Sequence, residues 1–443
     1  MKMVIENRVW DPAAEMMVRE DLTRLQLARL KTTIARASRI EYYRQEFAKR
    51  RITPESINSL DDLKRLPFTT KKQMRDNYPF GFFALPPSQL ARVHGSSGTT
   101  GKPTMVGYTK SDMELWSNLC ARFLTAGGLT PDQLVQIAFG YGLFTGGFGL
   151  HYGIERVGAA TVPASSGNTQ RQIMLLHDLG INTLICTPSY ALNIAEALRA
   201  SGIPQSEMKL RFGHFGAEPW TEKMRERLEE ELHIHAFNNY GLSEIIGPGV
   251  AGECAARRGM HLQEDHFIVE CIDPDTLEPV PEGEYGELVI TTLTKEACPM
   301  IRYRTRDLAR IFTDPCPCGR TGKRMSWVKG RSDDMMIVRG VNIFPSQVEE
   351  ALFRVGGTAP HYQIELYRPH NLDEAVLKVE MQPDHFSDRM DEMQKLKERI
   401  GREVTSITGI QFRIELVAPN SLERFVGKAK RVHDHRDLNP DQQ

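Results

Sequence analysis

The chain has 443 residues, with 56 Lys and Arg against 57 Asp and Glu and a formal net charge of -1. This length allows two or three domains and a large core, and the balanced charge gives no electrostatic reason to expect nucleic acid or an anionic membrane as a partner. The first residues lack the apolar stretch of a signal peptide, no apolar run is long enough to span a bilayer, and seven cysteines do not make a disulfide scaffold in a chain this long. We therefore expect a cytoplasmic, soluble enzyme.

The first two thirds of the chain change texture twice. Apolar residues at Leu22, Leu25, Leu27, Leu30 and Ile34 predict a helix. From about residue 133, short apolar runs such as 134–140 and 182–189 alternate with amphipathic stretches, which predicts parallel βαβ units. After residue 265, strand-like segments separated by turn residues predict a β-rich subdomain.

The last hundred residues are built differently. Residues 361–368, 374–382 and 410–418 alternate as half-buried strands, and a helix with Met390, Met393, Leu396, Ile400 and Val404 on one face lies between the last two. We predict an α/β fold with a large N-terminal domain over residues 1–332 and a small mobile α+β domain over residues 333–443.

Residues 93–109, VHGSSGTTGKPTMVGYT, contain a dense glycine and hydroxyl loop. It is not a Walker loop, because Ser96 stands where the first glycine is needed and Pro103 follows Lys102. Small side chains and uncovered backbone amides still suit an oxyanion, and a lysine adds positive charge. A flexible surface turn is the alternative. We favour a phosphate loop, with the candidate residues Ser96, Ser97, Gly98, Thr99, Thr100, Gly101 and Lys102.

A second group of residues suits a metal ion. Cys316 and Cys318 form a tight thiolate pair in Cys-Pro-Cys-Gly, and Cys254 with His261 would complete a tetrahedral Cys₃His set. Four protein ligands leave no position for water, which favours a structural Zn²⁺ over a catalytic one. Buried reduced cysteines are the alternative.

Six motifs in order resemble the adenylate-forming superfamily of acyl-CoA synthetases. The phosphate loop comes first, followed by FGAEPW (215–220), NNYGLSE (238–244), YRTRD (303–307), GRSDD (330–334) and GKAKRV (427–432). The connecting text, including YGLFTGGFGLHYG and YGLSEIIGPGVAGEC, is similar to phenylacetate–CoA ligases, and the resemblance extends from about residue 20 to 435.

The resemblance implies a nucleotide site. Ala217 and Glu218 would line the adenine pocket beside Tyr240, Asp307 would accept both ribose hydroxyls, and Arg331 would reach the ribose or phosphate. Ser243 would contact the α-phosphate, and Glu244 would hold Mg²⁺, a cation that prefers oxygen ligands. Lys428 would be the catalytic lysine of adenylate formation. The same motifs add Asn239 and Gly241 to the nucleotide site.

The resemblance also implies a hinge at Asp333 and a coenzyme A channel bordered at Gly340. Aromatic side chains beside paired glycines predict a pocket for a flat aromatic acid, although core packing would explain any one of them. The candidate lining residues are Tyr141, Phe144, Gly147, Phe148, His214, Gly216, Ala217, Ile245, Ile246 and Pro248. His214 departs from the apolar residue expected there, and it either faces a ring substituent or packs behind its strand.

We expect an ATP-dependent ligase that joins phenylacetate or a close analogue to coenzyme A. An adenylyltransferase of the deazaflavin-cofactor type, which does not use coenzyme A, is the main alternative. A non-catalytic nucleotide-binding or zinc-stabilised scaffold and a carrier-protein-loading enzyme are further alternatives. The partners are then small molecules, and a homodimer is an oligomeric state that the sequence leaves open.

Overall fold

The structure is a computed structural model that describes residues 5–96, 103–333, 335–339, 341–369, 373–382, 390–424 and 430–436. Contacts divide the chain into two compact units. The larger comprises Met1–Cys186, Pro204–Ala217 and Ile234–Trp327, and the smaller comprises Thr187–Ile203, Glu218–His233 and Val328–Gln443. Among the described residues, no helix has the length and apolar character needed to cross a membrane.

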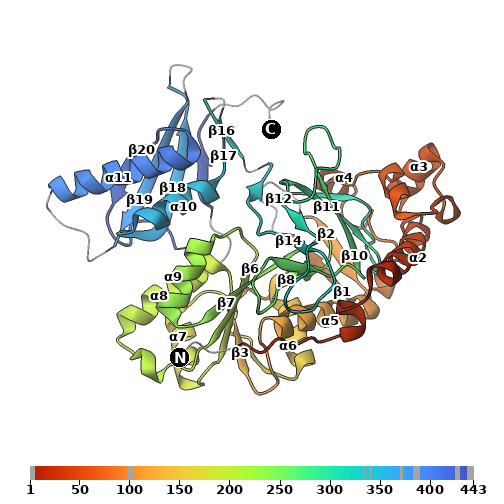
Figure 1. Cartoon of the computed structure of the whole chain (residues 1–443), viewed down its shortest axis with the longest axis horizontal. Coiled ribbons are helices and arrows are strands. Elements are labelled where there is room, and N and C mark those ends of the chain that lie inside the picture. The colour runs from red at the N-terminus through yellow and green to blue at the C-terminus, as the bar shows by residue number, and fades with distance from the viewer. Residues whose placement is uncertain are drawn as a thin grey trace. The chain divides into compact units, whose positions relative to one another are not determined.

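The larger unit is built on a nine-stranded sheet (Figure 1). Its parallel part confirms the predicted βαβ units and contains β3 (Leu134–Ile137), β4 (Ala160–Val162), β5 (Thr183–Cys186), β6 (Phe212–Gly216) and β7 (His235–Leu242). Antiparallel strands extend it, namely β8 (Gly247–Glu253), β9 (Met260–Leu262), β14 (Arg324–Met325) and β13 (Ile311–Phe312). Every residue of β5 and β6 is buried, as expected for strands that have both faces covered.

Three helices belong to this part of the chain: α5 (Lys110–Ala126), α6 (Gly146–Val157) and α7 (Thr169–Asp178). Helices α5 and α6 pack closely against each other and against β8. Glycines allow this approach, because a Cβ atom at Gly149 would lie 2.3 Å from the Trp116 ring and one at Gly153 would lie 2.4 Å from Cys120 Cβ. The packing fixes the N-terminal end of α6, where Thr145 lies.

Two smaller sheets complete the larger unit. Strands β10 (Phe267–Ile272), β11 (Gly286–Thr292) and β12 (Tyr303–Ala309) pair antiparallel, which confirms the β-rich segment predicted after residue 265. Strands β1 (Arg92–Gly95) and β2 (Met105–Tyr108) form an antiparallel pair on either side of the predicted phosphate loop. The N-terminal helices are α1 (Pro12–Glu15), α2 (Arg19–Ala37), α3 (Glu41–Arg50) and α4 (Lys71–Asp76), and α2 is the first helix predicted from the sequence.

The smaller unit contains an α+β fold, as predicted. A mixed sheet in the order β20-β19-β18-β21 packs against helices α10 and α11, and their apolar side chains form one buried cluster. The bounds are α10 (Pro345–Val355), β18 (Thr358–Tyr367), β19 (Glu374–Met381), α11 (Met390–Thr408), β20 (Arg413–Val417) and β21 (Val432–Asp434). The hairpin of β16 (Met336–Val338) and β17 (Val341–Ile343), and helices α8 (Pro188–Ser201) and α9 (Glu222–Leu232), belong to the same unit. The domain boundary between residues 332 and 333 stays a prediction.

Candidate active site

A hydrogen bond between Tyr240 and Asp307 joins the nine-stranded sheet to the sheet of β10, β11 and β12. Tyr240 lies near the end of β7 and Asp307 lies in β12, and the Tyr240 hydroxyl donates to Asp307 Oδ2 at 2.7 Å. Both side chains are less than a tenth exposed. The structure thus brings together the residues that the sequence assigns to adenine and to ribose, although they are 67 positions apart.

The turn that follows β7 carries Ser243 and Glu244. The Ser243 and Thr145 hydroxyls lie 2.8 Å apart, so the turn is tied to the start of α6. Glu244 is 4% exposed, and its Oε1 lies 3.4 Å from Lys71 Nζ. The turn is tight and requires glycine at position 241, since a Cβ atom there would lie 1.9 Å from the Gly247 carbonyl oxygen.

A buried lysine also contacts the backbone of this turn. Lys295 is 1% exposed, its Nζ donates to the Glu244 carbonyl oxygen at 3.4 Å, and it lies 4.9 Å from the centre of the Tyr108 ring. Burial lowers the pKa of Lys295, while Cys298, Asp112 and Glu244 oppose that effect. The Tyr108 hydroxyl donates to the Ile246 carbonyl oxygen at 3.1 Å. Two buried side chains therefore hold the backbone of the turn in place.

The end of β6 is similarly fixed. Asn239 Nδ2 donates to the Phe215 carbonyl oxygen at 2.9 Å, and a Cβ atom at Gly216 would lie 2.6 Å from the Asn239 carbonyl oxygen. The next residue, Ala217, has a positive φ of 71°. In the smaller unit, Glu218 Oε1 accepts from the Ser189 backbone N–H at 2.7 Å.

The predicted phosphate loop is closed at its base. Residues Ser97, Gly98, Thr99, Thr100, Gly101 and Lys102 lie outside the described residues. On either side of them, the Ser96 N–H donates to the Thr104 carbonyl oxygen at 2.9 Å, and the Thr104 N–H donates to Ser96 Oγ at 3.3 Å. The Gly95 N–H also donates to the Leu143 carbonyl oxygen at 2.9 Å.

Aromatic residues gather around the start of α6. Tyr141 and Phe148 meet edge to face with ring centres 5.2 Å apart, and Arg92 lies 4.7 Å over the Phe148 ring. The Tyr141 hydroxyl lies 3.2 Å from His151 Nδ1, and burial raises the pKa of Tyr141. A Cβ atom at Gly147 would lie 3.5 Å from the Tyr141 ring.

The other candidate pocket residues have different surroundings. Ile245 and Ile246 are fully buried, and the Pro248 carbonyl oxygen accepts from the Trp116 indole at 2.8 Å. Phe144 is half-buried, with its ring 2.7 Å from the place that a Cβ atom of Gly146 would take.

His214 packs within the protein core. Its ring stacks on Phe237 with centres 5.5 Å apart and meets Phe123 at 6.4 Å, and its Cε1 would lie 2.5 Å from a Cβ atom at Gly127. The side chain is 1% exposed, and its Nε2 has no hydrogen-bond partner among the described residues. Burial lowers the pKa of His214 to about 3.

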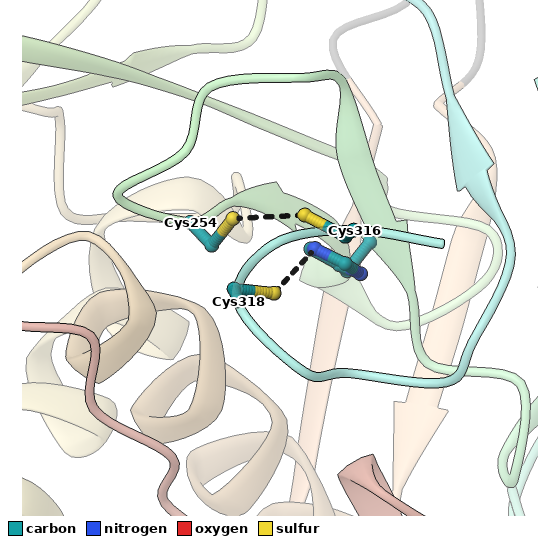
Figure 2. Close-up of side chains that lie close together, drawn as sticks. Cys254, Cys316 and Cys318 are labelled. Atoms are coloured by element: carbon teal, nitrogen blue, oxygen red, sulfur yellow. Dashed lines mark hydrogen bonds between the residues drawn. The ribbon is translucent and has the colours of Figure 1, made fainter. Parts of the chain in front are cut away.

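The four predicted metal ligands come together in the larger unit (Figure 2). The ligand atoms of Cys254, His261, Cys316 and Cys318 all lie within 4.8 Å of one another, and all four residues are buried. Cys254 Sγ and Cys316 Sγ are 3.7 Å apart, and Cys318 Sγ and His261 Nε2 are 3.2 Å apart. Three sulfur atoms and one imidazole nitrogen at these separations fit a tetrahedral zinc site.

The N-terminal segment is tied to the loop that carries two of these cysteines. Asn7 Nδ2 donates to the Cys318 carbonyl oxygen at 2.6 Å, and Arg320 donates to Glu15 at 2.6 Å in a buried ion pair. The Thr321 hydroxyl donates to the Met17 carbonyl oxygen at 2.6 Å.

Some of the predicted site residues belong to the smaller unit, and others lie outside the residues that the structure describes. Arg331 pairs with Asp333 through two contacts of 2.9 Å, beside the predicted hinge. Lys428, the predicted catalytic lysine, and Gly340, the predicted channel residue, lie outside the described residues.

Three neighbours of the turn at Ser243 and Glu244 were not predicted from the sequence, namely Lys71, Thr145 and Lys295. Lys71 comes from α4 and Lys295 from the segment between β11 and β12, far apart in the chain. In the sequence, each of these lysines is marked only by its charge within an apolar or turn-rich segment. Charged residues of this kind are too common for one to be selected as a site residue.

Comparisons with known proteins show the family to which the chain belongs. Residues 11–294 match the AMP-binding enzyme family, and residues 340–436 match the AMP-binding enzyme C-terminal domain. The chain is 46% identical to the phenylacetate-coenzyme A ligase of Thermus thermophilus, over 97% of this chain and 100% of that protein. It is 45% identical to the phenylacetate-coenzyme A ligase of Escherichia coli strain K12, over 98% of this chain and 99% of that one.

A solved structure shares the fold. The crystal structure of 2-hydroxyisobutyryl-CoA ligase in the postadenylation state, in complex with 2-HIB-AMP, has a TM-score of 0.91 and 28% identity, covering 98% of this chain and 94% of that chain. The chain therefore belongs to the AMP-binding enzymes and, among these, to the family of phenylacetate-coenzyme A ligases. This confirms the resemblance found in the sequence.

The core position of His214 gives a prediction for pH. The folded pKa of His214 is about 3, below the ordinary 6.5. Below pH 6.5 the unfolded chain therefore takes up a proton that the folded chain does not bind, and the free energy of unfolding falls as the pH falls. Replacing His214 by Phe removes this proton uptake. We expect the drop in unfolding free energy from pH 7 to pH 5 to be smaller by about 2 kcal/mol in His214→Phe.

Denaturant titrations of both chains at the two pH values measure this difference. His177→Phe is the matched control, because hydrogen bonds to Asp178 and Glu207 raise the pKa of that half-buried histidine. An equal pH dependence in His214→Phe and the parent would show that His214 protonates in the folded state and contacts water.

Proposed function

We propose that the protein activates an aromatic acid, phenylacetate or a close analogue, as an acyl-adenylate and transfers the acyl group to coenzyme A. A carboxylate oxygen attacks the α-phosphorus of ATP, and the bond to the bridging oxygen of pyrophosphate breaks. The thiol of coenzyme A then loses its proton and attacks the acyl carbon, and AMP leaves. The observation that carries the proposal is the buried Tyr240–Asp307 pair beside the Ser243–Glu244 turn, in a chain that matches phenylacetate-coenzyme A ligases over nearly its whole length.

The nucleotide end of the site uses residues that are already held in place. Asp307 accepts the ribose hydroxyls, which suits a carboxylate with two acceptor oxygens. Tyr240 lies beside adenine, with Ala217, Glu218, Asn239 and Gly241 nearby, and Arg331 reaches the ribose or phosphate. The hydrogen bond from the Tyr240 hydroxyl to Asp307 fixes the orientation of both side chains before ATP binds. Such preorganisation lowers the entropy that binding must remove.

The phosphate end is polar and supported from several elements. Ser243 contacts the α-phosphate, and residues 96–102 surround the β- and γ-phosphates with amides and Lys102. The buried carboxylate of Glu244 fits a hard cation such as Mg²⁺, which neutralises phosphate charge when bound. Lys71, 3.4 Å from the same carboxylate, must move or share it when the cation arrives.

The acid end is aromatic. The edge-to-face pair of Tyr141 and Phe148 supplies aromatic surface of the kind that suits a phenyl ring. The burial of His214 against Phe123 and Phe237 favours its role as a core residue over contact with a ring substituent. This removes the residue that suggested a polar ring substituent and favours an unsubstituted ring, as in phenylacetate.

The test is product analysis with ATP and Mg²⁺ across a panel of aryl and alkyl acids, each with and without coenzyme A. We expect AMP and pyrophosphate release to require an aryl acid and to reach full turnover only with coenzyme A. Pyrophosphate release that is indifferent to coenzyme A would favour an adenylyltransferase and contradict the ligase.

The smaller unit supplies the remaining proposed parts. Lys428 bridges the carboxylate and the α-phosphate during adenylate formation, and the chain turns at Asp333 between the half-reactions to place Gly340 at the coenzyme A channel. In Lys428→Ala, adenylate formation should fall at least a hundredfold, while thioester formation from supplied acyl-adenylate survives.

The matched control for this variant is Lys430→Ala, which removes an exposed lysine two positions along the chain. It should keep both half-reactions. A Lys428→Ala enzyme that forms adenylate at the parent rate would show that another group stabilises the developing charge.

We propose a structural zinc ion at Cys254, His261, Cys316 and Cys318. The four donors are buried and their ligand atoms lie close together, and His261 Nε2 faces the group while Nδ1 has no hydrogen-bond partner among the described residues. Cys316→Ser should reduce zinc from about one ion per chain to a small fraction and lower the melting temperature.

Elemental analysis of the purified chains measures the zinc. Cys271→Ser is the control, because Cys271 donates to the Ala309 carbonyl oxygen and lies outside the group of four. Zinc content that is unchanged in Cys316→Ser would exclude this site.

A further inference from the structure

Asp307 lies in an irregular stretch of β12. In the pairing of β11 with β12, Glu287 lies opposite Leu308 and Val289 lies opposite Arg304, so Leu288 alone faces three residues of β12. These three residues, 305–307, form a bulge. Arg306 within it has a φ of 68°, in the left-handed region that a side chain other than glycine rarely adopts.

The carboxylate of Glu287 holds this bulge from the neighbouring strand. Glu287 is fully buried, and its two oxygens accept from Arg304 Nε at 3.0 Å and from another Arg304 nitrogen at 2.7 Å. Oε1 also accepts from the Arg306 backbone N–H at 3.3 Å, and the Arg306 guanidinium lies 3.5 Å from Oε2. One buried carboxylate thus contacts the residues on both sides of Thr305.

Two further contacts carry the bulge to Asp307. The Thr305 hydroxyl donates to the Leu288 carbonyl oxygen at 2.8 Å, and the Asp307 N–H donates to Thr305 Oγ1 at 3.0 Å. The Tyr240 hydroxyl then reaches the Asp307 carboxylate at 2.7 Å. The direction of the Asp307 side chain therefore depends on a backbone shape that Glu287 maintains.

We propose that Glu287 is a positioning residue for the nucleotide: it acts through the bulge to aim Asp307 at the ribose hydroxyls, without touching the ligand itself. The inference rests on the proposed function, since it assumes that Asp307 binds ribose. A carboxylate is needed because it accepts from two guanidinium groups and a backbone N–H together. An amide at this position has one acceptor oxygen and adds a donor that faces two cations.

The first test is Glu287→Gln, with steady-state kinetics for ATP and for the acid. We expect the KM for ATP to rise about tenfold to a hundredfold, because a misplaced binding group loses its contact, with the KM for the acid nearly unchanged. In the parent, 2′-deoxy-ATP and 3′-deoxy-ATP should give a lower kcat/KM than ATP. This difference should be smaller in Glu287→Gln, since a misdirected Asp307 no longer binds the ribose hydroxyls.

The matched control is Glu270→Gln. Glu270 makes the same two-point contact with the buried Arg302, at 2.8 and 3.0 Å, in the same sheet, but it does not touch the bulge. It should leave ribose discrimination unchanged. An equal effect of Glu270→Gln on discrimination would mean that general weakening of the sheet is responsible, and would overturn the proposal.

A double-mutant cycle with Asp307→Ala separates positioning from folding. If Glu287 acts through Asp307, its effect on the KM for ATP largely disappears in the Asp307→Ala background. An undiminished effect in that background overturns the proposal. Absence of turnover in the parent chain would instead overturn the proposed function, and with it the role of Glu287.

If Glu287→Gln does not fold, the partly exposed Arg306 gives the same test. Arg306→Gly keeps a residue that adopts positive φ, and Arg306→Val introduces one that resists it. The valine variant should raise the KM for ATP and weaken ribose discrimination, whereas the glycine variant should stay within about threefold of the parent. Equal kinetics for the two variants would show that the bulge does not set the Asp307 direction.

Discussion

The hydrogen bond between Tyr240 and Asp307 is the constraint around which the candidate site is arranged. It connects β7, in the mainly parallel nine-stranded sheet, to β12, in the separate antiparallel sheet. Strands of a parallel sheet deliver side chains to one edge at their carboxyl ends, where ligands of α/β proteins commonly bind. The antiparallel sheet supplies the second wall, and this contact fixes the two walls 2.7 Å apart at one point. Ser243 and Glu244 directly follow the last residue of β7, so their positions depend on the same strand end as Tyr240.

Buried charge around this point is expensive to desolvate, and each described case is offset by specific partners. Glu287 faces Arg304 and Arg306, while Lys295 donates to the Glu244 backbone and lies over the Tyr108 ring. A small displacement of the backbone would separate these buried partners and leave a charge without compensation. The paired groups therefore resist such displacements. The candidate site is therefore held in place by contacts within the chain, with the aromatic pair of Tyr141 and Phe148 beside the start of α6.

Periodicity predicted α2, the parallel strands and the α+β tail because these features repeat locally in the sequence. Motif order predicted the family, since six spaced segments rarely occur together by chance. The surroundings of His214 could not be predicted, because a strand residue faces either side of the sheet and the neighbours Phe123 and Phe237 come from other elements. Lys71, Lys295 and Glu287 act through contacts between distant segments, and their charges alone did not distinguish them from surface residues. The bulge at Arg306 was equally hidden, because arginine carries no signal for positive φ.

The central claim is that a substrate carboxylate attacks the α-phosphorus of ATP in this site. Transfer of ¹⁸O from doubly labelled phenylacetate tests it most directly, with mass spectrometry of the phosphorus products after turnover with ATP, Mg²⁺ and coenzyme A. We expect one ¹⁸O atom in the phosphate of AMP and unlabelled pyrophosphate. Label in inorganic phosphate, with ADP as the nucleotide product, would show attack on the γ-phosphorus and exclude acyl-adenylate formation.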